Sequence, residues 1–309
     1  MAKRWLFLVW VTVLPLARAQ ADKAPVAKPV RPIPAIEHVV VIGVDGARPD
    51  VLLLADTPTL HGLIKQGAYT MWARTTAVSV TIPSFMSMMT GVTPRKHLVE
   101  WDRDLPFAQP VYPRYPTVME MATQAGYVTA MVAGKGKFSV FNKPGTITHA
   151  FVPTVEKAPD ADTAVQAVKV ITDFKPDFLF VHFAQVDSVG HAKGWGSHEQ
   201  LEQLAATDGD IAQVLAALDR AGMRDATAVI VSADHGGAGL THGPDDPRSR
   251  HIPWIVSGPG VKSGCDLTQD AVLTVRTEDT CATACWLLGL PLPEYFDGRP
   301  VKEAFETAK

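Results

Sequence analysis

Short apolar runs alternate with amphipathic segments along most of the chain. The apolar runs are five to seven residues long, nearly unbroken and mostly rich in valine or isoleucine, which is typical of parallel strands covered on both faces. The expected strands are His38–Val44, Val128–Ala133, Phe178–Phe183, Ala228–Ser232 and Ile252–Ser257. The expected helices are Pro58–Gln66, Thr117–Gln124, Asp162–Phe174, Glu199–Ala221 and Glu278–Leu288. This alternation predicts an α/β fold with a doubly wound, mostly parallel sheet and helices on both faces.

Residues 1–19 have the features of a signal peptide. Lys3 and Arg4 precede an uncharged apolar run, and Ala17-Arg18-Ala19 then matches a small-x-small cleavage pattern. The run is shorter than the roughly 20 residues that a membrane-spanning helix needs. We therefore predict export to the periplasm or secretion, with no transmembrane span after processing. An uncleaved anchor is the alternative.

A tether and one folded domain are expected after the signal peptide. Residues 20–36 are rich in alanine, proline and lysine and lack hydrophobic periodicity, which favours a flexible tether. Residues 37–309 carry the alternating pattern and are predicted to form a single domain. A small cap insertion is expected over Glu100–Pro116.

The composition is that of an ordinary globular protein. The chain has 309 residues, of which 47% are hydrophobic and 20% are charged, and its formal net charge is −3. These values exclude intrinsic disorder, a membrane bundle and a small disulfide scaffold. Because there is no basic excess to neutralise phosphates along a backbone, they also argue against specific nucleic-acid binding.

The three cysteines leave the disulfide pairing open. Cys281 and Cys285 are four residues apart on an expected helix, where a bond between them would have poor geometry. A bridge from Cys265 to either of them would leave one free thiol. No C-x-x-C pair is present, which disfavours a thiolate metal site.

Aspartate and histidine side chains gather where the apolar strands end. Such strand ends share one edge of a parallel sheet, and ligand sites form outside that edge. Each residue alone could serve as a turn, a cap or a surface group. Together they offer oxygen and nitrogen ligands, which zinc accepts, and two ions about 4 Å apart can support phosphoryl chemistry. The candidates are Asp45, Asp187, His191, Asp234, His235 and His242.

These residues lie in motifs that resemble the alkaline phosphatase superfamily, and specifically its type I phosphodiesterase/nucleotide pyrophosphatase branch. The motifs follow the family's order from residue 38 to about residue 260. The resemblance implies that residues 37–309 form one catalytic domain that binds two divalent ions, zinc by expectation. The motifs are G-V-D-G, T-I-P-S, M-T-G-V-T-P, D-S-V-G-H, A-D-H-G-G and T-H-G.

The resemblance also implies which residues hold each ion. One zinc ion would be held by Asp187, His191 and His242. The other would be held by Asp45, Asp234, His235 and the hydroxyl oxygen of Thr81. His251 lies nine residues after His242 and is the alternative for the last histidine. We prefer His242 because T-H-G-P-D-D, followed by an apolar strand containing proline, fits the family pattern.

Thr81 is the candidate nucleophile. A threonine hydroxyl is a weak nucleophile at neutral pH, and a bound metal ion can activate it. Thr81 stands just before an expected helix start, with Pro83 in the first turn, so backbone N–H groups would face the phosphoryl oxygens. The resemblance implies a covalent phospho-threonine that water then cleaves. A simple helix cap is the alternative role of Thr81, and Ser79 and Ser84 are the alternative hydroxyls.

Four further residues are predicted to bind substrate. Ser84 stands where the family's diesterases have asparagine in T-F-P-N. Lys135 and Lys137 follow the strand Val128–Ala133 and resemble a lysine pair of phosphonoacetate hydrolases, although a solvated loop is the alternative. Trp101 is either a pocket wall or a packing residue.

The sequence thus predicts an exported di-metal hydrolase of small phosphate esters, acting on phosphodiester or pyrophosphate bonds. A phosphomonoesterase or a phosphonoacetate-hydrolase-like enzyme of the same fold is the first alternative, and a non-catalytic zinc-binding protein is the second. Sulfatases carry C-x-P-S-R, whereas this chain has T-I-P-S-F, which disfavours sulfate-ester hydrolysis. The natural substrate and the oligomeric state stay open.

Overall fold

The computed structural model describes residues 28–103, 111–243 and 246–306. The predicted signal peptide lies outside these residues, as do the first part of the tether and the middle of the expected cap. None of the described helices combines the length and apolar character needed to span a bilayer. Within the described residues Cys265, Cys281 and Cys285 are free thiols.

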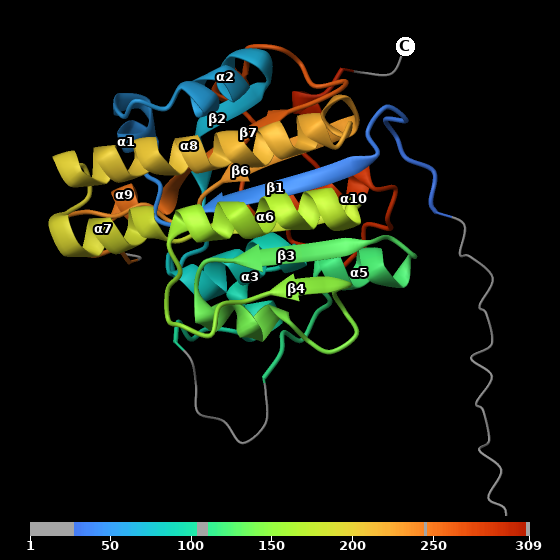
Figure 1. Cartoon of the computed structure of the whole chain (residues 1–309), viewed down its shortest axis with the longest axis horizontal. Coiled ribbons are helices and arrows are strands. Elements are labelled where there is room, and N and C mark those ends of the chain that lie inside the picture. The colour runs from blue at the N-terminus through green and yellow to red at the C-terminus, as the bar shows by residue number, and fades with distance from the viewer. Residues whose placement is uncertain (1–27, 104–110, 244–245, 307–309) are drawn as a thin grey trace, which may run out of the picture.

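An eight-stranded sheet forms the centre of the described fold, in the order β4-β3-β5-β1-β6-β7-β2-β8 (Figure 1). All neighbouring pairs are parallel except those of β7, which runs antiparallel to both β6 and β2. The mostly parallel sheet predicted from the sequence is therefore confirmed. The strands are β1 (His38–Val44), β2 (Ala68–Arg74), β3 (Thr129–Ala133), β4 (His149–Phe151), β5 (Phe178–Phe183), β6 (Thr227–Ser232), β7 (His251–Ser257) and β8 (Cys265–Asp266).

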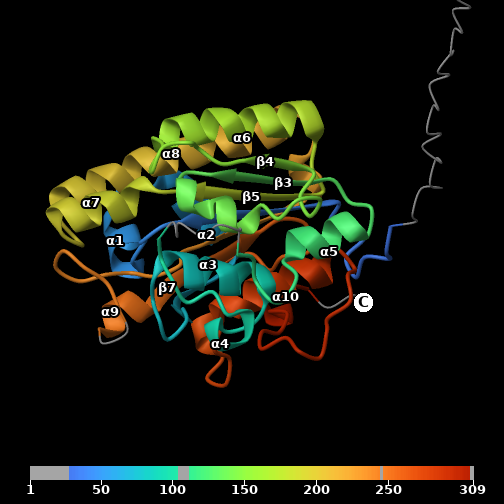
Figure 2. The same cartoon turned by 90° about the horizontal axis from the view of Figure 1, so that it is seen from below.

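Helices cover both faces of this sheet. Figure 2 shows α6 and α8 on one side and α3, α5 and α10 on the other. Every expected helix is present with similar bounds, and α3 is the helix expected at Pro83. The helices are α1 (Pro49–Leu54), α2 (Pro58–Gln66), α3 (Thr81–Thr90), α4 (Pro94–His97), α5 (Val118–Gln124), α6 (Asp160–Phe174), α7 (Gln185–Lys193), α8 (His198–Arg220), α9 (Pro247–Arg250) and α10 (Thr277–Leu287).

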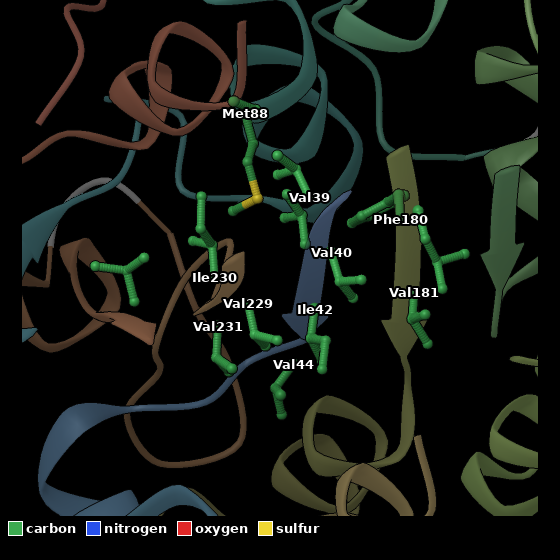
Figure 3. Close-up of a cluster of buried hydrophobic side chains, with 14 of the residues drawn as sticks. Val39, Val40, Ile42, Val44, Met88, Phe180, Val181, Val229, Ile230 and Val231 are labelled. Carbon is green, nitrogen blue, oxygen red and sulfur yellow. The ribbon is translucent and has the colours of Figure 1, made fainter. Parts of the chain in front are cut away.

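The core lies between the sheet and its two helix layers. The side chains of β1, β5 and β6 are buried on both faces of the sheet, which explains why these strands are apolar without alternation. Figure 3 shows them packed together, with Met88 of α3 reaching toward β1 and β6. Burying each such aliphatic side chain contributes about 1.5–3 kcal/mol, so this core fixes the strand ends firmly.

The strand order decides where the polar side chains meet. β1 lies between β5 and β6, with Val44 opposite Phe183 and Gly43 opposite Ser232. The carboxyl ends of these three strands therefore stand side by side at one edge of the sheet. Residues that follow them directly are brought together although they are far apart in the sequence.

Candidate metal centre

Three aspartates converge at this edge of the sheet. Asp45 follows β1 directly, Asp187 lies in the first turn of α7 just after β5, and Asp234 lies two residues beyond β6. Their relative exposures are 0%, 3% and 0%. Three carboxylates withdrawn from water need partners, because an unpaired buried charge is strongly destabilising.

Two of the carboxylates share one buried ammonium group. Lys135 Nζ lies 2.7 Å from Asp45 Oδ2 and 2.7 Å from Asp187 Oδ2. His182 Nε2 adds a second contact to Asp45 Oδ2 at 3.0 Å. Burial alone would raise the pKa of both carboxyl groups, but the Lys135 ammonium outweighs it and holds each pKa below its usual range.

The third carboxylate is paired differently. Asp234 Oδ1 accepts the backbone N–H of Gly46 at 3.0 Å. Burial, reinforced by the negative charge of Asp45, raises the pKa of Asp234 well above its usual range. A cation beside this carboxyl group would favour its ionised form.

Each aspartate keeps one buried oxygen without a hydrogen bond. Within the described residues these atoms are Asp45 Oδ1, Asp187 Oδ1 and Asp234 Oδ2, and His235 Nε2 is unpaired in the same way. The imidazole nitrogen lies 3.1 Å from Asp234 Oδ2, 3.6 Å from Asp45 Oδ1 and 4.0 Å from Asp187 Oδ1. We call these four residues the metal cluster. Buried polar atoms are almost always satisfied in proteins, so four that face one another mark the place of an absent partner.

The three predicted histidine ligands are oriented alike. Each Nδ1 contacts a backbone carbonyl, which can only accept, so Nδ1 carries the proton and Nε2 is left as a ligand atom. His191 Nε2 lies 3.3 Å and His242 Nε2 3.8 Å from Asp187 Oδ1. Burial and the neighbouring His242 lower the pKa of His235 to about 4, so it is neutral at pH 7. The Nδ1 contacts are His191 to Leu240 (3.0 Å), His235 to Gly236 (2.8 Å) and His242 to Ser79 (2.8 Å).

The donor atoms fall into two sets, each compact enough to hold an ion. Within each set, the ligand atoms lie within 4.8 Å of one another, and His235 belongs to both. His191 is in neither set, but it faces Asp187 from the rim with its side chain 40% exposed. Oxygen and neutral nitrogen donors without thiolate fit a divalent ion such as zinc. The sets are Asp45, Asp234 and His235, and Asp187, His235 and His242.

The alternative ligand His251 belongs to neither set found among the described residues. It begins β7, its ring stacks on Trp72 with centroids 3.8 Å apart, and its Nδ1 contacts the carbonyl of Pro247. These contacts account for the ring face and Nδ1 of His251, whereas its Nε2 has no hydrogen bond in the described chain. The structure therefore favours His242 as the last histidine.

Thr81 opens onto a cavity of about 420 Å³ that also reaches the candidate ligands. It is the first residue of α3, whereas Val80 occupies the cap position, so the alternative role of Thr81 as a helix cap is wrong. Ser79, two residues earlier, has a φ of 51°, a conformation that non-glycine residues rarely adopt outside functional turns. The cavity is lined by Thr81, Asp102, Arg103, Lys135, Lys137, Glu156, Lys157, Asp187, His191 and His242.

The four predicted substrate-binding residues are placed unequally. Lys135 and Lys137 both line the cavity, but Lys135 is buried among the carboxylates, whereas Lys137 is more exposed and pairs with Asp102 at 2.8 Å. Ser84 is fully buried and bonded to threonine hydroxyls, and Trp101 packs against the core. Neither Ser84 nor Trp101 is among the residues that line the cavity in the described part of the chain.

His182 is a functional residue that the sequence reasoning missed. It lies inside β5 and is fully buried. Its Nδ1 accepts the backbone N–H of Gly134 at 3.2 Å, so Nε2 carries the proton and donates to Asp45 Oδ2. Such a partner fixes the orientation of a ligand carboxylate. The available signal was a histidine within the otherwise apolar run F-L-F-V-H-F.

Asp102 and Trp195 also contact the backbone beside the candidate site residues. Asp102 Oδ1 accepts both the Lys137 ammonium and the backbone N–H of Ile82, next to Thr81, each at 2.8 Å. The indole N–H of Trp195 donates to the carbonyl of Gly46, directly after Asp45, at 2.9 Å. The Trp195 ring also meets His191 edge-on, with centroids 5.0 Å apart. These contacts are made across the fold, so the local sequence around each residue does not predict them.

Comparisons with known proteins agree with this geometry. A sequence model of the family described as type I phosphodiesterase/nucleotide pyrophosphatase matches residues 39–246. Murine ectonucleotide pyrophosphatase/phosphodiesterase 5 superposes with a TM-score of 0.71 at 15% identity, covering 87% of this chain and 100% of that one. A structure described as a 2-O GAG sulfatase gives 0.70 at 16% identity, covering 92% and 75%. At such identities the likeness shows the fold.

Curated relatives match over shorter stretches. Alkaline phosphatase PhoD of Zymomonas mobilis is 37% identical over 92 residues, which is 27% of this chain and 16% of that protein. Arylsulfatase K of Danio rerio is 35% identical over 92 residues, which is 28% of this chain and 17% of that protein. The match spans less than a fifth of either relative's length.

Proposed function

The chain belongs to the type I phosphodiesterase/nucleotide pyrophosphatase family of the alkaline phosphatase superfamily, and from this premise we propose that it is a metal-dependent hydrolase of phosphate esters with Thr81 as nucleophile. The observation that carries the proposal is the metal cluster, whose four buried ligand atoms lack partners among the described residues. The cluster shares the wall of one cavity with Thr81 through Asp187.

The proposed reaction has two displacements at phosphorus. The Thr81 oxygen forms a bond to phosphorus while the bond to the leaving oxygen breaks, which gives a phospho-threonine. Water then attacks phosphorus, releases phosphate or a phosphomonoester and restores the hydroxyl. Thr81 stands at the N-terminus of α3, where the helix dipole favours the negative charge of the phosphoryl group.

Two bound divalent ions, zinc by expectation, would lower the pKa of the nucleophile and offset charge on the phosphoryl oxygens. The residues that would hold them are those expected from the sequence: Asp45, Thr81, Asp234 and His235 for one, and Asp187, His191 and His242 for the other. His182 and Lys135 hold two of these carboxylates on their opposite oxygens. The ligand atoms are therefore oriented before any ion binds.

Small diesters or pyrophosphates are the first substrate class proposed. The family description supports this choice, and a murine relative was solved as an inactive threonine-to-alanine variant in complex with AMP. A cavity of about 420 Å³ suits a substrate of small-molecule size. We keep export, through the signal peptide over residues 1–19, as part of the proposal.

A second class, phosphomonoesters or phosphonates, is favoured by one observation. The buried Lys135 ammonium adds a positive charge directly beside the metal cluster. More highly charged phosphoryl groups gain more from such a charge.

A substrate panel tests the proposal. The zinc-loaded protein, beginning at Gln20, is assayed on aryl phosphodiesters, aryl phosphomonoesters, phosphonates and a dinucleotide pyrophosphate. We expect turnover of at least one class, its loss after chelation and its return with zinc. Acid-quenched samples should carry a phosphate on Thr81 by mass spectrometry. Turnover that survives complete metal removal would overturn the proposal.

A further inference from the structure

Lys135 is a positive charge built into the candidate metal centre. It follows β3, the strand next to β5, and its side chain is 3% exposed. A lysine is almost never fully buried unless it is paired, and this one is paired twice, with Asp45 and with Asp187. The sequence reasoning gave Lys135 and Lys137 the same role, but the structure separates them.

The contacts of Lys135 leave the ligand positions open. It bonds to the Oδ2 atoms of Asp45 and Asp187, whereas the Oδ1 atoms are those without partners in the described chain. The ammonium and the ions would therefore occupy opposite sides of the same carboxylates. The two carboxylates belong to different ligand sets, so Lys135 joins both halves of the centre. Both lysines line the cavity, but the Lys135 side chain is 3% exposed and bonds to the two ligand carboxylates, whereas Lys137 is 17% exposed and pairs with Asp102.

The ammonium group of Lys135 changes the net charge of the candidate metal centre. With all three carboxylates ionised, as two bound divalent ions would favour, the carboxylates, the Lys135 ammonium and the two ions together carry +2. Without Lys135 the loaded centre would carry +1. The contribution of the ammonium does not vary with metal occupancy. By Coulomb's law, a phosphoryl group with two negative charges gains twice as much from it as a group with one.

We propose that Lys135 is a positioning residue that sets the fixed charge of the centre and selects doubly charged phosphoryl groups, those of phosphomonoesters and phosphonates, over singly charged phosphodiesters. This inference rests on the proposed function and chooses between its two substrate classes. It requires the wild-type kcat/KM for an aryl monoester to exceed that for the matched aryl diester.

The test replaces Lys135 with methionine, which keeps the length of the side chain and removes its charge. For Lys135→Met we expect the ratio of monoester to diester kcat/KM to fall by about 10–100-fold, with most of the loss on the monoester. Lys135→Arg retains the charge and should recover most of the ratio. Lys169→Met, at an exposed position of α6, is the matched control and should leave the ratio unchanged.

Two binding measurements separate charge-setting from a merely structural role. Elemental analysis of Lys135→Met should show zinc retained, since removing a cation does not weaken cation binding electrostatically. By calorimetry, inorganic phosphate should bind the zinc-loaded variant at least ~10-fold more weakly than wild type. Dimethyl phosphate, with one charge, should lose only about the square root of the factor that inorganic phosphate loses.

Loss of zinc from Lys135→Met, an unchanged ratio, or a wild-type preference for the diester would each overturn the inference. If the wild-type protein hydrolyses no ester, the proposed function fails separately. The phosphate titration then still decides the role of Lys135, because it needs no turnover.

Discussion

Two clusters of buried polar side chains lie beside each other at the carboxyl end of β5, and they differ in how their atoms are satisfied. The first is the metal cluster of Asp45, Asp187, Asp234 and His235. The second, which we call the anchor cluster, consists of Asp160, Gln185 and Thr207. Asp160 begins α6, Gln185 begins α7 and Thr207 lies in α8.

The anchor cluster is satisfied from within. Asp160 Oδ1 accepts the backbone N–H groups of Ala184 (2.7 Å) and Gln185 (3.1 Å), and its Oδ2 accepts the Thr207 hydroxyl (2.8 Å). Gln185 Oε1 in turn accepts the backbone N–H of Asp160 at 2.6 Å. The anchor cluster thus ties α6 to α7, the helix that carries Asp187 and His191.

This difference distinguishes the anchor cluster, which holds helices together, from the metal cluster, which is suited to binding a ligand. Both clusters are buried except for the half-buried Gln185, so burial alone does not distinguish them. The anchor cluster needs nothing from outside, whereas each carboxylate of the metal cluster has one oxygen that no described residue satisfies. Satisfied polar networks fix a unique structure, and several unsatisfied atoms that face one another are suited to binding a shared ion or water.

The largest effect is expected at the nucleophile beside the metal cluster. Thr81→Ala should reduce kcat by at least ~1000-fold, because no other hydroxyl lines the cavity among the described residues. Zinc content should change little. Thr90→Ala, at the other end of α3 with its hydroxyl bonded to the carbonyl of Met86, is the control and should stay within a few-fold. Near-normal turnover of Thr81→Ala by steady-state kinetics would contradict the assignment.

A smaller effect is expected on metal binding. Asp234→Asn keeps the acceptor for the Gly46 N–H but removes the charge of the unpaired oxygen. Calorimetry should show zinc affinity falling by about 100-fold or more. The metal-free variant should unfold at the same temperature as the metal-free wild type or higher, because a buried carboxyl group without a partner is removed. A variant that binds zinc normally but is strongly destabilised would reverse the roles of the two clusters.

The anchor cluster should show the opposite pattern. Asp160→Ala leaves two backbone N–H groups and one hydroxyl without their acceptor, which should lower the free energy of unfolding by about 3 kcal/mol. The number of zinc ions bound at saturation should not change. Asp173→Ala, on the exposed face of the same helix, should change stability by less than about 0.5 kcal/mol. Denaturant titrations and elemental analysis together test this pattern.

The smallest effect is a dependence of stability on pH. Burial raises the pKa of Asp160 from 3.8 to about 6, so the folded state binds a proton that the unfolded state has released. Stability from this group is therefore full below about pH 4 and is lost as the pH rises through about 6, on the order of 2 kcal/mol. Asp160→Asn should remove that slope. Equal slopes in both proteins, from unfolding at pH 4 to 7, would show that Asp160 does not titrate in this way.

Local pattern predicted the central strands but not the edges of the sheet. β1, β5 and β6 are buried on both faces, so their sequences read as unbroken apolar runs. β2 was missed because it is not an unbroken apolar run: its residues alternate in burial, and it contains exposed Trp72 and Arg74. β4 and β8 are three and two residues long, too short for any periodicity. The antiparallel direction of β7 depends on how the chain connects it to the rest of the sheet. The amino-acid composition of the strand does not reveal this direction.

The candidate site could be predicted as far as it depends on strand ends. Asp45, Asp187 and Asp234 each follow a recognisable strand, and the topology brings them together. The different positions of Lys135 and Lys137 could not be predicted. The two residues are only two positions apart, and the local backbone conformation decides which side chain is buried. His182 and Asp102 act through contacts made across the fold, so the sequence around them carries little of the information.

Anomalous X-ray diffraction at the zinc edge, on crystals of the zinc-loaded protein, would show whether the unpaired atoms of the metal cluster are metal ligands. We expect two anomalous peaks, bonded to Oδ1 of Asp45, Oδ1 of Asp187, Oδ2 of Asp234 and Nε2 of His235. Zinc bound elsewhere, with these four atoms still unpaired, would contradict this expectation.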